Sequence, residues 1–104
     1  MKIPNRFEKL KSRHGKFIEA VEALGKAVRA EGPTEEKTAL LIQLAAAAAV
    51  KSEGSVHSHT RRALAAGATP EEITHAVILL TSIIGFPAVA AALSWVDDIL
   101  DDIS

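Results

Sequence analysis

The sequence predicts an all-α fold, a single domain of about five helices. Hydrophobic residues make up 48 % of the chain and aromatic residues only 4 %, with alanine supplying much of the difference, which is typical of closely packed helices. Apolar residues recur at steps of three and four, and glycine, proline and helix-capping residues separate the apolar segments. At 104 residues the chain can form one core but is marginal alone, so we expect burial against a partner subunit.

The first segment, residues 1–31, predicts one amphipathic helix of about seven turns that ends at Gly32-Pro33. Its apolar stripe consists of Ile3, Phe7, Leu10, His14, Phe17, Val21, Leu24 and Val28. Because His14 lies within the stripe, we expect it to be a hydrogen-bonded core histidine. Residues 1–30 carry eight Lys or Arg against three Glu. The acids are interleaved with the bases and no stacking aromatics accompany them, so a solvated face is expected rather than nucleic-acid binding.

The second helix is expected to begin at Thr34, which would cap a first turn containing Glu35 and Glu36. Eleven of the twelve residues in 39–50 are apolar, which predicts a helix surrounded by protein on nearly all sides. Gln43 is its one buried polar candidate.

Local signals then define the next two boundaries. Gly67 is expected to end the third helix in a left-handed conformation. The run Thr69-Pro70-Glu71-Glu72 supplies a cap, a first-turn proline and a capping-box acid for the fourth helix. Gly85-Phe86-Pro87 is expected to end that helix and to begin the fifth.

The last helix carries two apolar stripes, although a helix at the edge of a small monomer needs only one. One stripe comprises Val89, Leu93, Val96, Leu100 and Ile103, and the other Ala88, Ala92, Trp95 and Ile99. We therefore expect an oligomer interface formed by Val89, Leu93, Trp95, Val96 and Ile99. The remaining face carries only acids, and residues 88–104 contain four Asp and no Lys or Arg.

Composition also limits the chemistry and the compartment. The chain has no cysteine, which excludes disulfides, thiol redox chemistry and thiolate metal sites. No apolar run approaches the roughly 18 to 20 residues that span a bilayer. The N-terminus shows no signal-peptide pattern, so a cytoplasmic location is the default expectation.

The most informative polar residues are Ser52, Ser55 and His59, which share one face of a helix at i, i+3 and i+7. Two hydroxyls and an imidazole stand at spacings where a thiol redox site would have two cysteines. Ser55 and His59 could act as nucleophile and base, but the sequence offers no orienting acid. In the alternative interpretation, Ser52 caps the helix, Ser55 bonds backbone groups and His59 is a partly buried, hydrogen-bonded residue.

A metal site is not expected from the histidines. His57 and His59 lie about 200° apart around a helix, so they cannot both bind one ion from a regular helix. Further ligands would have to come from elsewhere, and the other histidines are His14 and His75. We expect no metal and no cofactor.

Three features together resemble the alkyl hydroperoxidase D-like, carboxymuconolactone decarboxylase family over roughly residues 34–100. They are Lys37-Thr38 opening an apolar helix, the 52/55/59 spacing, and the run from His59 to Ile73. The resemblance implies an antiparallel helical bundle, usually a trimer or hexamer. It also implies, for redox members, two cysteines separated by two residues, a histidine four positions after the second, and a glutamate twelve before the first.

Transferred to this chain, the family pattern places Ser52 and Ser55 at the cysteine positions, His59 at the histidine and Leu40 at the glutamate. Serine forms neither an accessible thiolate nor a disulfide, so peroxidase activity is not expected. A decarboxylase is also disfavoured, because His59 lacks the acidic partner. The expectation is a non-redox homo-oligomeric scaffold, a trimer or hexamer, with neither nucleic acid nor membrane as a partner and with residues 34–103 as the family-like core.

Two origins fit this pattern. One is a natural subfamily in which His57, His59 and Gln43 line a small-molecule site, or in which His59 retains a lactone- or decarboxylase-type activity. The other is an engineered, self-assembling component of a cage, alone or with a second designed component.

Overall fold

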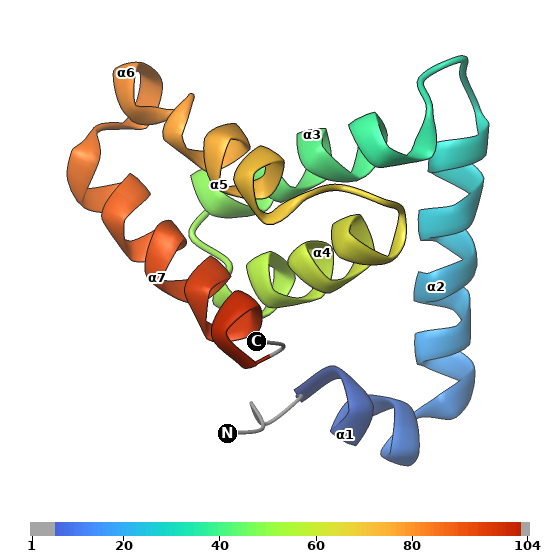
Figure 1. Ribbon diagram of the computed structural model, residues 1–104. Helices are drawn as coiled ribbons and strands as arrows, with labels where there is room; N and C mark the ends of the chain where they lie inside the picture. Colours follow the sequence, from blue (N-terminus) through green and yellow to red (C-terminus); the bar gives the residue numbers. More distant parts are fainter. Residues whose placement is uncertain (1–5, 103–104) are drawn as a thin grey trace.

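The computed structural model describes residues 6–102, with side chains from residue 8 onward, and all the elements in this range are helices (Figure 1). The order is α1 (Arg6–Arg13), α2 (Gly15–Ala30), α3 (Glu36–Ala49), α4 (Glu53–Ala65), α5 (Pro70–Ile78), α6 (Thr81–Ile84) and α7 (Phe86–Asp102). The all-α prediction is confirmed. No helix in the described part of the chain is long and apolar enough to cross a membrane.

The core lies among four helices. α3 and α4 run antiparallel as a hairpin, and α7 packs across α4 and α5 (Figure 1). The largest fully buried apolar side chains of this core are Leu44, Val56, Ile73, Val77, Val89 and Val96. Alanines fill the space between them and let the helices approach closely, as the composition predicted.

The turn between α4 and α5 follows its local signals. Gly67 has φ +96°, and the N–H groups of Gly67 and Ala68 donate to the carbonyls of Leu64 and Ala63, at 3.0 and 2.9 Å. These two bonds form a Schellman motif, which satisfies carbonyls that the helix end leaves open. Thr69 then closes a capping box with Glu72, confirming the predicted start of α5.

The prediction of one long first helix is wrong. The chain breaks at His14, which has φ −136° and ψ 59°, so that α1 and α2 run in different directions (Figure 1). His14 is exposed, so it is not the core histidine that the stripe predicted. The next residue, Gly15, has a low helix propensity, so an interruption of the helix at this point costs little free energy. Two stripe positions, Ile3 and the side chain of Phe7, lie outside the described residues.

The predicted N-cap of α3 is also wrong. Glu35, not Thr34, occupies the N-cap position, and its carboxylate accepts a hydrogen bond from the Thr38 hydroxyl at 3.2 Å instead of capping the helix. Nor does protein surround the helix within one chain. Ile42 is 59 % exposed and Val50 is 75 % exposed, because α4, α5 and α7 cover only one side of α3.

The fourth helix is shorter than predicted. α5 ends at Ile78, and the one-turn α6 precedes Gly85, whose φ is +92°. The Thr81 hydroxyl donates to the Ile78 carbonyl at 2.7 Å. A side chain that bonds nearby backbone in this way competes with a continuous helix, and it accompanies the break.

Most of the predicted α7 interface lies inside the single chain. Val89, Val96 and Ile99 are at most 3 % exposed and contribute to its core, whereas Leu93 and Trp95 are only partly buried. Ala92 of the second stripe is also fully buried, so both stripes of α7 pack largely on the chain's own helices. Ile103, the end of the first stripe, lies outside the described residues.

Candidate functional site

Ser52 and Ser55, the two hydroxyls of the predicted site, lie at the beginning of α4. Ser52 is the N-cap, and its hydroxyl oxygen accepts a hydrogen bond from the Ser55 N–H at 3.4 Å. This contact satisfies one of the backbone donors that a helix start leaves unpaired. The Ser52 hydroxyl thus has a structural role as a helix cap.

His59 follows one turn later and has a defined tautomer. Its Nδ1 lies 2.9 Å from the Ser55 carbonyl oxygen, which can only accept, so Nδ1 carries a proton and Nε2 keeps its lone pair. The imidazole thus bonds the Ser55 backbone through Nδ1, so that this nitrogen cannot take a proton from the Ser55 hydroxyl.

The surroundings of His59 favour the neutral imidazole. Burial lowers its pKa, the hydrogen bond to the Ser55 carbonyl opposes this, and the positive charges of Arg62 and Arg29 lower the pKa further. A neutral imidazole with a free Nε2 lone pair can accept a proton or a hydrogen bond.

Leu40, at the position where the resemblance implies a glutamate, is 2 % exposed and borders a cleft of about 290 Å³ between α2, α3 and α4. The cleft is lined by Glu22, Lys26, Arg29, Glu36, Leu40, Arg62, Ala65 and Ala66. Two of its cations, Arg29 and Arg62, are those that act on His59. The cleft is therefore rich in charge, but Leu40 places an isobutyl group where the resemblance implies a carboxylate.

The structure gives Gln43 and His57 different neighbours. Gln43 borders a separate hollow of about 220 Å³ that it shares with Val28 and Arg29 of α2, and its buried Oε1 has no hydrogen-bond partner among the described residues. His57 instead lies against α7. In the single chain the two side chains thus lie against different elements, Gln43 against α2 and His57 against α7.

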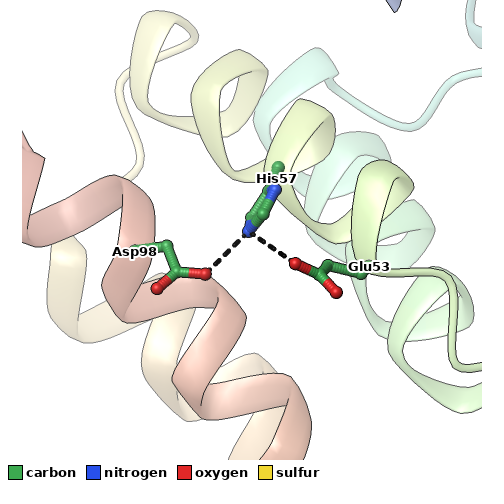
Figure 2. A group of neighbouring side chains, drawn as sticks. All are labelled: Glu53, His57 and Asp98. Carbon is green, nitrogen blue, oxygen red and sulfur yellow. Dashed lines mark hydrogen bonds and ion pairs between the residues drawn. The ribbon is translucent and has the colours of Figure 1, made fainter. Parts of the chain in front are cut away.

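A cluster that the sequence analysis missed surrounds His57 (Figure 2). The His57 Nε2 lies 3.0 Å from Oδ2 of Asp98 on α7 and 4.0 Å from Oε2 of Glu53 on α4. His57 is 8 % exposed, whereas the side chains of Glu53 and Asp98 are 58 % and 41 % exposed. The Glu53–His57 pair was visible in the sequence as an i, i+4 spacing, but only the packing of α7 on α4 brings Asp98 to it.

Comparison with known families adds one finding to this geometry. A family model described as the carboxymuconolactone decarboxylase family matches residues 15–98, which include α2 to α6 and most of α7. Neither curated proteins nor solved structures gave a match to the chain.

Proposed function

Because this chain belongs to the carboxymuconolactone decarboxylase family and lacks cysteine, we propose that it serves as a non-redox, homo-oligomeric helical scaffold. The single observation that supports this function best is the exposed apolar face of α2. It consists of Phe17, Val21, Leu24 and Val28, each between 42 and 64 % exposed.

The chemistry of the site supports the non-redox part of the proposal. Ser52 and Ser55 occupy the places of the two thiols, and Ser52 is committed to capping α4. A serine hydroxyl gives up its proton far less readily than a thiol and forms no disulfide, so neither peroxide reduction nor its recycling can proceed by the family's thiol route.

The geometry of α2 supports the oligomeric part. The row that faces the rest of the molecule consists of the buried and half-buried residues of the helix, which are Gly15, Ile18, Glu22, Gly25 and Arg29. The exposed apolar face lies about 100° around the helix from this row. A helix that turns a continuous apolar stripe away from its own core is typical of a protein that buries the stripe against another chain.

We take a second copy of this chain as the partner. The exposed apolar surface continues from Val28 to Ile42 of α3, because both residues line the same hollow. The net positive charge of residues 1–30 and the four aspartates of residues 88–104 would also attract each other between copies. A small chain buries a low fraction of its surface on folding, and self-association would bury more of this apolar surface.

Native mass spectrometry and light scattering at micromolar chain concentration test the proposal. We expect a trimer or a multiple of it. Leu24→Glu places a charge in the apolar face and should dissociate the oligomer, whereas Ala23→Glu adds the same charge at an exposed position about 100° away and should not. A monomeric parent, or equal behaviour of the two variants, would refute an interface on α2.

The same measurement distinguishes the two origins. A natural family-like scaffold stops at a trimer or hexamer. An engineered cage component requires a much larger particle, either alone or after mixing with a second component, and the absence of such a particle under all conditions tested would count against it.

A second candidate function, a residual small-molecule or lactone-type activity, is supported by His59. Its free Nε2 lone pair and lowered pKa suit a general base near neutral pH. His59→Ala should then abolish turnover of lactone or ester substrates. A parent without any turnover would eliminate this function and leave the scaffold proposal unaffected.

A further inference from the structure

We propose that Glu53, His57 and Asp98 bind one divalent transition-metal ion that links α4 to α7. Figure 2 shows the two carboxylates converging on one edge of the imidazole, from opposite sides. The three candidate ligand atoms, His57 Nε2, Asp98 Oδ2 and Glu53 Oε2, all lie within 4.8 Å of one another.

The distances between these atoms suit a small ion. Zn²⁺ lies about 2.0 to 2.2 Å from nitrogen and carboxylate ligands in a tetrahedral site, which separates the ligand atoms by about 3.4 Å. The observed separations of 3.0 Å, between His57 and Asp98, and 4.0 Å, between His57 and Glu53, lie on either side of this value. Small movements of the two exposed carboxylates would bring both separations to it.

Hydrogen bonding accounts for the position of Asp98 in the cluster but not for that of Glu53. A single N–H at His57 Nε2 points to one acceptor, and Asp98 at 3.0 Å takes that place. Glu53, at 4.0 Å, is beyond hydrogen-bond reach but still brings a second negative charge to the same nitrogen. A divalent cation that displaces this proton, to Nδ1 or to solvent, would contact both carboxylates and the Nε2 lone pair at once.

The burial of the cluster suits a metal site that is open on one side. The His57 ring is held among core residues and fixes the direction of Nε2, while both carboxylates reach solvent. An ion can therefore enter from the surface, and water would complete its coordination, as at sites with three protein ligands.

The donor set indicates the class of metal. One imidazole nitrogen with two carboxylate oxygens suits Zn²⁺ and its first-row neighbours such as Fe²⁺, Mn²⁺ and Co²⁺. Ca²⁺ takes six to eight oxygen ligands, and Mg²⁺ is usually held through oxygen ligands and water, so both fit this set less well.

Zinc binding to the metal-stripped, tag-free full chain tests the proposal. Isothermal titration with Zn²⁺ should give one ion per chain. The same preparation titrated with Co²⁺ should develop a visible absorption band that reports ordered coordination. Glu53→Gln and Asp98→Asn should each weaken Zn²⁺ binding at least tenfold, because each substitution replaces an anionic ligand by a neutral amide.

Two controls keep the test decisive. His75→Ala removes an exposed histidine of α5 and should leave Zn²⁺ binding unchanged. His57→Ala should abolish binding, but it alters the core, so the exposed Glu53→Gln variant decides the matter if His57→Ala fails to fold. Zn²⁺ should also raise the melting temperature of the parent and not that of Glu53→Gln. Absence of saturable binding, or binding that survives both carboxylate substitutions or disappears with His75, overturns the proposal.

Discussion

At the scale of single residues, His59 connects the protonation of one side chain to the stability of the fold. Its pKa lies below the ordinary value of 6.5, chiefly because burial disfavours the charged ring. Below pH 6.5 the unfolded chain takes up a proton here that the folded chain resists. Stability from this residue is therefore complete above that pH and falls as the pH drops through the folded-state pKa.

The prediction is that His59 titrates below pH 6.5 in histidine NMR spectra and that His59→Gln flattens the fall in unfolding free energy between pH 7 and pH 5. Arg62→Gln removes a positive charge that acts on the ring, so it should move the His59 pKa upward. If His59 titrated at or above 6.5, the assignment of a partly buried, neutral imidazole would be incorrect.

Gln43 offers a second prediction at this scale. Its buried Oε1 lacks a hydrogen-bond partner among the described residues, and an unsatisfied buried acceptor costs about 1 to 3 kcal/mol. Gln43→Met keeps the length of the side chain without the amide and should raise the free energy of unfolding by about 1 kcal/mol in urea denaturation. Gln43→Glu, with nearly the same shape and a charge, should lower it. A less stable Met variant would instead indicate that a second chain satisfies the amide.

The sequence indicated which residues belong to the candidate site, but not which atoms they contact. The spacing of Ser52, Ser55 and His59 depends only on one helix, and that helix forms. Their chemistry depends on atoms that spacing does not determine, since His59 bonds the backbone of Ser55. Asp98 is 41 residues from His57, so only the packing of two helices could reveal their contact.

At the scale of elements, the two glycines of the α4 region allow a matched prediction. An added Cβ would meet open space at both Gly54 and Gly67, so only backbone conformation distinguishes them. Gly67→Ala forces an L side chain to φ +96° and should destabilise the fold by about 1 to 2 kcal/mol. Gly54→Ala lies within α4 and should be neutral or stabilising by up to about 1 kcal/mol, judged by thermal unfolding. Equal effects would mean that Gly67 does not terminate the helix as described.

The boundaries of the helices were predictable where a few adjacent residues determine them. The capping box at Thr69 and the left-handed Gly67 use contacts within one turn, and both form as predicted. The break at His14 was missed because the apolar spacing runs through it unaltered, and spacing carries no information about a single residue that leaves helical geometry. Periodicity thus indicates which residues share a face more reliably than where a helix is continuous.

At the scale of the whole molecule, apolar periodicity indicated more apolar surface than one small chain needs and placed the expected interface on α7. Val89, Ala92, Val96 and Ile99, which come from the two stripes of α7, belong to the core of the single chain, whereas the apolar face of α2 is exposed. The sequence alone could not make this distinction, because both helices carry apolar stripes and only the packing decides which stripe meets the chain's own helices. The proposed interface therefore rests on the α2 residues.

The nature of this interface gives the last prediction. An oligomer held by apolar side chains should persist in 1 M NaCl, where screening reduces the Debye length to about 3 Å. An oligomer held by the basic N-terminal and acidic C-terminal segments should dissociate there, because its attraction is between solvated charges. We expect the dissociation constant to change less than about tenfold, or 1.4 kcal/mol, between 0.05 and 1 M NaCl. Leu24→Glu should change it more, since burial of a leucine contributes about 1.5 to 3 kcal/mol and burial of an unpaired charge adds a cost.

Light scattering at fixed chain concentration and several salt concentrations measures both effects. Separation of the parent's subunits in 1 M NaCl would show that the charged segments, and not the α2 face, hold the copies together. An apolar contact through α2 requires three results together. The parent should stay oligomeric in 1 M NaCl, Leu24→Glu should dissociate, and Ala23→Glu should not. Only an apolar contact through α2 is both insensitive to screening and specific to one face of the helix.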